Sequence, residues 1–275
     1  MINVVSFCLW GTNPHYLNGA ESALESVHTL YPDWESWIYI AEDVPNESIA
    51  RLTEKASRVI RMTRGHGRKL RNSATTQFQF EPAFWRFLPA SDPSVSKLLV
   101  RDSDSPVTPR EVAAVNEWLA SGKGFHIMRD HPKHEYPILA GLWGTDTALL
   151  RDIDQLIRKW NRFDYYGCDQ TFLAKIIYPH VRKHAYIHSE CIMFPHEVIH
   201  HFPTPRQDSD FIGISHTGDE SRLALQIRYL NEWIGAGSPV YLRPLPWSLK
   251  GLVRIYSRGR FMSGRALPPS AHWDP

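Results

Sequence analysis

The feature that most constrains the fold is an apolar run followed by a polar turn and a clearly marked helix start, within residues 96–111. The run 98–100, Leu-Leu-Val, is typical of a buried strand in a parallel sheet. Thr108 predicts an N-cap, Pro109 the first helical position and Glu111 the partner of a capping box. A strand, a turn and a helix in this order predict an α/β fold with the turn at the carboxyl edge of its sheet.

Two carboxylates, Asp102 and Asp104, stand in that turn on either side of Ser103. Ligands of open α/β sheets bind outside the carboxyl ends of the strands, and a turn lets both side chains converge on one cation. Two hard oxygen ligands suit Mg²⁺ or Mn²⁺, with water and substrate phosphate completing the shell. The alternative is ordinary solvated turn chemistry. The strand before and the helix after favour a metal–diphosphate site.

Composition excludes several classes of protein. The 275 residues are 43% hydrophobic, enough for a large core, and the formal net charge of +2 gives no global field for binding nucleic acid. Three widely spaced cysteines, Cys8, Cys168 and Cys191, are typical of reduced thiols in a cytosolic protein. The chain begins without a signal-peptide pattern and has no apolar run approaching ~18 residues, so we expect a cytoplasmic protein.

The first 61 residues alternate between strand and helix patterns. Such a β-α-β-α-β unit begins a nucleotide-binding half, and its first strand and loop often hold a nucleotide base. Expected elements are strands at 2–9, 37–40, 58–60, 98–100, 125–128, 185–193 and 211–214, and helices at 20–30, 46–55, 81–89, 109–121, 149–160 and 219–234.

Charged side chains accompany several of these elements. Arg86 lies in an aromatic segment and needs an anionic partner, either a nucleotide phosphate or the Asp pair. Asp130 follows the strand at 125–128 and adds a second acidic strand end, which predicts a cleft. Asp169, beside Gln170, either caps a helix or faces a ligand. The basic loop 61–72 either closes over phosphates or is a solvated surface loop.

The tail, residues 236–275, interleaves cations with bulky apolar side chains. This pattern suits a membrane surface or an acidic partner, so we expect peripheral contact with the inner membrane surface. A packed helix with a basic outer face is the alternative. The fourteen histidines show no structural-zinc spacing.

Several motifs together carry a resemblance to a known family. Glycines at 141 and 144 would let the backbone approach a ligand closely. The motifs are Ser6-Phe7-Cys8-Leu9-Trp10-Gly11, Phe84-Trp85-Arg86-Phe87, Arg101-Asp102-Ser103-Asp104-Ser105, Arg110-Glu111 with Trp118-Leu119, His126-Ile127-Met128-Arg129-Asp130-His131-Pro132, Gly141-Leu142-Trp143-Gly144 and Asp169-Gln170. Over residues 1–215 they resemble the glycosyltransferases of the A-type fold with an Asp-x-Asp motif, most strongly the bacterial polysaccharide type.

The resemblance implies a single Rossmann-like domain at 1–235 with a mixed, mainly parallel central sheet, followed by the basic extension at 236–275. The domain would consist of a nucleotide-binding half at 1–105 and an acceptor half at 106–235. It implies a UDP- or GDP-sugar donor, Mn²⁺ or Mg²⁺, and a glycan or lipid-linked acceptor. The implied donor residues are Phe7, Leu9 and Trp10 around the base, Arg86 and Arg101 orienting the phosphates or the Asp pair, and Asp102, Ser103 and Asp104 at the metal and ribose. Arg129, His131, Gly141 and Trp143 are the implied acceptor or sugar contacts.

The resemblance also suggests how the sugar is transferred. The Asp169-Gln170 pair looks like the Asp-Gln motif of retaining, glycogenin-like transferases, which favours retention, with Asp130 as the competing catalytic residue. A third metal ligand is implied, for which His188 is favoured over His201 and His216. Two rival functions stay open: a phosphatase of the haloacid-dehalogenase type, whose motif belongs on the first strand, and a non-catalytic module that binds nucleotide sugars.

Overall fold

A computed structural model describes residues 1–65, 78–215, 220–244, 254–257 and 260–262. Its strands are β1 (Ile2–Leu9), β2 (Glu35–Ala41), β3 (Arg58–Met62), β4 (Val95–Arg101), β5 (Phe125–Arg129), β6 (Leu142–Asp146), β7 (Ala185–Ser189), β8 (Ile192–Met193), β9 (Ile199–His200), β10 (Val240–Leu242), β11 (Arg254–Ser257) and β12 (Arg260–Met262). Its α-helices are α1 (Pro14–Leu30), α2 (Asn46–Lys55), α3 (Pro82–Trp85), α4 (Pro109–Ala120), α5 (Ile153–Trp160), α6 (Cys168–Phe172), α7 (Tyr178–Val181) and α8 (Glu220–Gly235). Two 3-10 helices, η1 (Leu88–Ser91) and η2 (Thr147–Leu149), and one π-helix, η3 (Leu173–Ile177), are also present in the described residues.

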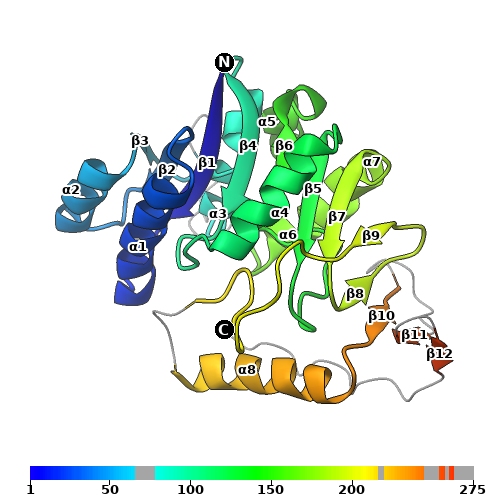
Figure 1. Cartoon of the computed structure of the whole chain (residues 1–275). Coiled ribbons are helices and arrows are strands. Elements are labelled where there is room, and N and C mark those ends of the chain that lie inside the picture. Colours follow the sequence, from blue (N-terminus) through cyan, green and yellow to red (C-terminus); the bar gives the residue numbers. More distant parts are fainter. Residues whose placement is uncertain (66–77, 216–219, 245–253, 258–259, 263–275) are drawn as a thin grey trace.

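An eight-stranded sheet, ordered β3-β2-β1-β4-β6-β5-β7-β9, forms the centre of the fold (Figure 1). Only β6 is antiparallel to its neighbours, β4 and β5, and the other pairs are parallel. The predicted α/β class with a mixed, mainly parallel sheet is therefore confirmed.

Helices cover both faces of this sheet because successive strand residues point to opposite sides. In β1, Val5, Phe7 and Leu9 pack with α1, α2 and α4. Val4, on the other face of β1, joins the larger core with side chains of α3, α5 and α6. A strand buried on both faces reads as a continuous apolar run, which is why these strands were visible in the sequence.

The β-α-β-α-β start is confirmed, and so is the helix start after β4. The Thr108 side chain accepts a hydrogen bond from the Glu111 backbone N–H at 3.3 Å, and Gly122 follows α4 at φ +70°. Helix α1 begins six residues before its predicted start, because Asn13 caps it and Pro14 occupies the first position.

Three expectations about the later elements were wrong. Residues 142–146 form an antiparallel strand that was not expected, inserted between β4 and β5. The predicted helix at 81–89 is divided into α3 and η1, and residues 211–214 form a turn although three of them are buried. Apolar content predicted burial at these positions but not the backbone conformation.

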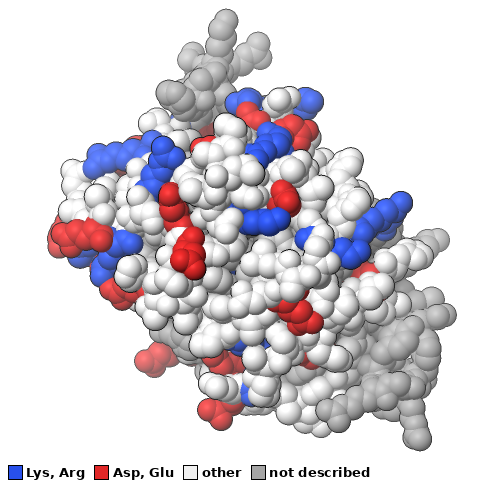
Figure 2. Space-filling model, turned by 45° about the horizontal axis from the view of Figure 1, so that its top comes forward, with Lys and Arg blue, Asp and Glu red and all other residues white. Residues whose placement is uncertain are grey.

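A smaller sheet, ordered β12-β11-β10-β8, links part of the tail to the main domain. The packed helix considered for residues 236–275 is not seen in the described parts of the tail, which form strands β10, β11 and β12. Tail residues 245–253, 258–259 and 263–275 and residues 66–72 of the loop 61–72 lie outside the described residues, and the predicted membrane contact stays a prediction. No helix in the described ranges combines the length and apolar character needed to cross a bilayer. On the face shown in Figure 2, basic and acidic side chains are interspersed.

Candidate active site

A cavity of about 950 Å³ lies at the carboxyl ends of β1 and β4. The loop after β1, the turn after β4 and the start of α6 contribute to its wall, and α8 lies below this edge of the sheet in Figure 1. Polar, aromatic and apolar side chains line the cavity, among them Cys8, Leu9, Trp10, His15, Tyr16, Arg86, Asp102, Ser103, Asp104, Ser105, His134, Tyr166, Asp169, Gln170, Gly213, Ser215 and Gln226.

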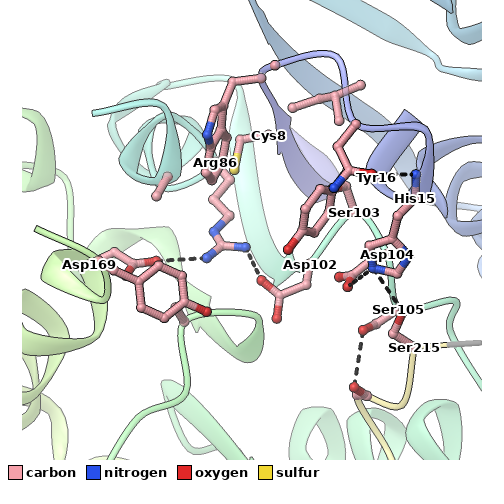
Figure 3. Close-up of a pocket in the computed structure, with 18 of the residues that line it drawn as sticks. Cys8, His15, Tyr16, Arg86, Asp102, Ser103, Asp104, Ser105, Asp169 and Ser215 are labelled. Carbon is pink, nitrogen blue, oxygen red and sulfur yellow. Dashed lines mark hydrogen bonds and ion pairs between the residues drawn. The ribbon is translucent and has the colours of Figure 1, made fainter. Parts of the chain in front are cut away.

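Arg86 joins two carboxylates across the cavity (Figure 3). Its Nη1 donates to Asp102 Oδ1 and its Nη2 donates to Asp169 Oδ2 at 2.9 Å. Burial alone would lower the pKa of Arg86, but the neighbouring carboxylates outweigh it and raise the pKa above its ordinary value. The expectation that this buried cation pairs with anions is met by Asp102 together with Asp169.

Asp104 lies beside His15, from the first turn of α1 (Figure 3). Asp104 Oδ2 is 3.1 Å from His15 Nε2, and the Asp104 side chain is 18% exposed. Burial, and then the charge of Asp102, raise the pKa of Asp104, while the hydrogen bond with His15 opposes this rise. Two carboxylates that repel each other in a partly buried turn are a suitable environment for a divalent cation.

Gly141 packs directly against the Asp-x-Asp turn. A Cβ on this residue would lie 2.2 Å from Asp102 Oδ2 and 2.8 Å from the Asp102 backbone nitrogen. The expected close backbone approach is therefore made to Asp102 rather than to a ligand, and it restricts where the Asp102 carboxylate can lie.

The segment before α8 completes one side of the cavity. Ser105 Oγ donates to the Gly213 carbonyl at 3.2 Å, and Ser215 Oγ lies 3.5 Å from His15 Nε2. These contacts connect the Asp-x-Asp turn to a part of the chain more than 100 residues away.

Burial sets the charge of the other titratable groups on the wall. It raises the pKa of the Cys8 thiol to about 12, so the thiol is protonated at neutral pH and is a poor nucleophile. Burial also raises the pKa of Asp169, and the Arg86 guanidinium opposes that rise. Asp169 Oδ1 accepts the Gln170 backbone N–H at 2.8 Å, so each of its oxygens accepts a hydrogen bond.

No protein-family model matches the chain, and no curated protein matches it. Several solved structures have a similar fold. The galactosyltransferase LgtC, in complex with donor and acceptor sugar analogues, is 13% identical with a TM-score of 0.44, over 85% of this chain and 99% of that one. A glycosyltransferase involved in glycosylating the major capsid of PBCV-1 is 15% identical with a TM-score of 0.41, and the match covers 70% of this chain and 85% of that one. The 4-diphosphocytidyl-2C-methyl-D-erythritol synthase of Anaerococcus prevotii is 13% identical, with a TM-score of 0.44 over 84% and 99%.

The structure brings many of the predicted residues into one cavity: Leu9, Trp10, Arg86, Asp102, Ser103, Asp104, Asp169 and Gln170. Two predicted donor contacts lie elsewhere. Phe7 is fully buried in the core beneath α1. Arg101 is 1% exposed and its Nε donates to Glu111 Oε1 at 2.6 Å, so its guanidinium neutralises a buried carboxylate of α4 and does not face a phosphate. Glu111 is thus used by Arg101 rather than by a reciprocal capping box.

The insertion of β6 displaces the predicted residues of β5 and its end from the cavity wall. Asp130 is fully buried and pairs with Arg206 at 2.6 Å and Arg110 at 3.1 Å. Arg129 pairs with Glu197 at 2.6 Å, and His131 contacts the Gln226 carbonyl at 3.0 Å. These contacts, and the burial of Trp143 in the core, indicate structural roles instead of the expected catalytic and sugar contacts.

His188 is the clearest error among the predicted metal ligands. Strand β7 lies three strands from β4, roughly 14 Å at ~4.8 Å per strand. The His188 ring is fully buried and contacts His126 at 2.8 Å and Glu117 at 3.2 Å. Of the alternatives, His201 pairs with Glu190, and His216 lies outside the described residues. No group of three His, Cys, Asp or Glu side chains in the described ranges converges as a metal site.

Sequence reasoning missed His15, Tyr16, His134 and Tyr166 at the cavity. A signal for His15 and Tyr16 was present, because Asn13-Pro14 is a helix-start signal that places them in a first turn at the carboxyl edge of β1. No pattern in the sequence indicated the position of His134 or Tyr166, which depends on loops.

Proposed function

We propose that this protein is a glycosyltransferase that moves a sugar from a nucleoside-diphosphate sugar to an acceptor hydroxyl. The observation that carries the proposal is the convergence of Asp102 and Asp104 on a large cavity, lined by both polar and apolar atoms, at the carboxyl ends of β1 and β4. This is the edge where α/β sheets of this strand order bind nucleotides. The motif resemblance described above supports the same function.

The donor's base and phosphates have suitable surroundings in this cavity. Leu9 and Trp10, which follow one another at the end of β1, form a partly apolar wall for the base. We place the pyrophosphate near the Asp-x-Asp turn, where Ser103 offers a hydroxyl group. Asp169 lies on the other side of Arg86 from Asp102 (Figure 3). We place the donor's sugar beside Asp169 and Gln170, which both line the cavity.

The chain's own groups fit a divalent cation held through two carboxylates. Asp104 and one oxygen of Asp102 would hold Mn²⁺ or Mg²⁺, and water and substrate phosphate would complete the shell. When bound, the cation would neutralise charge that develops on the diphosphate as the glycosidic bond breaks. Asp102 Oδ1 pairs with Arg86, so Arg86 fixes the orientation in which the second oxygen is presented.

The transfer replaces one bond at the anomeric carbon by another. The bond to the diphosphate breaks and the diphosphate leaves with the electron pair, while the acceptor oxygen forms the new bond and gives its proton to the departing diphosphate. We propose retention of the anomeric configuration, with Asp169 and Gln170 placed beneath the sugar. Asp169 acts as a positioning residue, because Arg86 and the Gln170 N–H already engage its oxygens.

The proposal is tested by measuring nucleoside diphosphate release from UDP-glucose, UDP-galactose, UDP-N-acetylglucosamine and GDP-mannose with Mn²⁺. We expect turnover of at least one donor and a loss of about 10²-fold or more in Asp104→Asn, the scale for removing a group that stabilises developing charge. The matched control is Asp154→Asn on α5, whose carboxylate pairs with Arg158 away from the cavity.

Two results would contradict the proposal. If none of the donors turned over and none stabilised the protein, the cavity would not be a donor site. If p-nitrophenyl phosphate were hydrolysed and Asp102→Asn abolished that activity, the protein would be a phosphatase. An α-linked product from an α-linked donor, seen by NMR, is expected for retention, and a β-linked product would refute it.

A further inference from the structure

Three exposed tyrosines lie on segments that line the cavity. Among the large apolar or aromatic side chains exposed in the described ranges, three are tyrosines: Tyr16 is 37% exposed, Tyr136 36% and Tyr166 67%. Tyr16 and Tyr166 line the cavity. Tyr136 does not line the cavity itself, but His134, Leu139 and Ala140 of the same loop do. Burial, and then the charge of Asp169, raise the pKa of Tyr136. The donor site proposed above uses none of these three rings.

The three rings come from separate parts of the chain. Tyr16 belongs to the first turn of α1, Tyr136 to the loop between β5 and β6, and Tyr166 to the loop before α6. Tyr166 makes an edge-on contact with Phe80, with centroids 6.1 Å apart and planes at 78°. Tyr16 makes a similar contact with the His15 ring at 4.7 Å. These contacts hold the rings in place while a large part of each stays accessible.

Neutral phenols suit a ligand that has both apolar and hydroxyl faces. Burial, and then the nearby carboxylate of Asp104, raise the pKa of Tyr16, so its hydroxyl keeps its proton and can donate a hydrogen bond. Aromatic faces carry partial negative charge and attract the polarised C–H groups on one face of a pyranose ring. The three tyrosine rings form a rim beside Asp169 and Gln170. The hydroxyl of an acceptor placed on this rim would therefore lie close to the proposed sugar contacts.

We propose that Tyr16, Tyr136 and Tyr166 form the acceptor subsite and that the acceptor is a saccharide. The role of this subsite as an acceptor site rests on the proposed transferase function. The binding of a saccharide to the three rings can be measured without a donor. A lipid tail would need a continuous apolar groove, whereas this rim combines rings with hydroxyl groups and lies beside carboxylates.

The test uses the full chain and saturation-transfer NMR with methyl glycosides of glucose, galactose and N-acetylglucosamine. We expect at least one glycoside to show saturation concentrated on its C–H ring face. Tyr166→Ala should weaken binding by roughly tenfold, whereas Tyr166→Phe, which keeps the ring, should bind within about threefold of the wild type. Val198→Ala is the control, because Val198 is 74% exposed and does not line the cavity.

The outcomes separate this inference from the proposed function. Each variant is also tested for thermal stabilisation by UDP and GDP with Mn²⁺, which Tyr166→Ala should leave unchanged. If nucleotides bind but no glycoside does, or if Tyr166→Ala leaves glycoside binding unaltered, the saccharide subsite is refuted and the donor site stands. If glycosides bind through Tyr166 but no nucleotide binds, the subsite stands and the transferase function is refuted.

Discussion

Gly141→Ala tests the coupling between the β6 entry and the Asp-x-Asp turn. The added Cβ would lie 2.2 Å from the Asp102 carboxylate oxygen and 2.8 Å from the Asp102 backbone nitrogen. Contacts this short cannot persist, and one of the close atoms belongs to the backbone, so the turn itself must shift. We expect Asp102 to move from its place beside Arg86. This displacement would weaken binding at any site that needs the carboxylates of both Asp102 and Asp104.

The magnitude follows from the cost of overpacking. Inserting one methyl group into a tightly packed position costs about 1–3 kcal/mol. For a domain of this size class, each kcal/mol lowers Tm by roughly 2–4 °C, so Tm should fall by roughly 2–12 °C. Calorimetric scanning measures Tm, and titration with UDP or GDP in the presence of Mn²⁺ measures nucleotide affinity in the folded fraction.

Two other glycines provide controls. In Gly144→Ala the added Cβ would lie 2.8 Å from Leu99 Cδ2 and 3.1 Å from Trp118 Cζ3, inside the core. This variant should lose comparable stability but keep its nucleotide affinity. Gly235→Ala has no neighbour within 4 Å and should change neither quantity. If Gly141→Ala kept wild-type nucleotide affinity despite its lower Tm, the reasoning that ties Asp102 to the ligand would be refuted.

Three further predictions concern the buried titratable side chains Arg86, Asp130 and His126. Arg86→Met should lower the free energy of unfolding, measured in urea, by about 3 kcal/mol. This is the lower end of the range for breaking a buried ion pair, because the Asp102 side chain is 44% exposed and regains contact with water. An unchanged midpoint of the urea transition would contradict this prediction. Asp130→Asn should lower Tm because Arg110 and Arg206 lose a charged partner, but turnover per folded molecule should not change. If the variant folded properly but were inactive, Asp130 would have a catalytic role after all. Burial, and then His188, hold the pKa of His126 well below its ordinary value, so only the unfolded chain takes up that proton. Stability should therefore fall below about pH 6.5 by up to ~1.4 kcal/mol per pH unit, and His126→Gln should reduce this slope in urea unfolding at pH 7 and 5.5.

The sequence contained enough local information to predict the β-α-β-α-β unit and the strand, turn and helix around the Asp-x-Asp turn. Strands such as β1 and β4 are buried on both faces and form apolar runs, and the Thr108-Pro109 pair marks a helix start by its own chemistry. The Asp-x-Asp turn lies between two such signals, so its place at the sheet edge follows from its neighbours.

The rest of the site depended on which strands are neighbours. The sequence of β6 indicates a strand only weakly because it contains Gly144. This strand nevertheless lies between β4 and β5 and displaces Asp130 from the cavity wall. Arg86 and Asp169 are 83 residues apart, and no local pattern predicts their ion pair. Tyr166 lies on a loop, where apolar periodicity carries no information.

The most direct test of the account is a crystal structure of the protein with UDP or GDP and Mn²⁺, using anomalous scattering to locate the metal. We expect the metal peak at bonding distance, about 2.1 Å, from an Asp104 oxygen and from the pyrophosphate, with the base near Trp10. Manganese elsewhere, or a nucleotide bound outside this cavity while both carboxylates face solvent, would contradict the central claim.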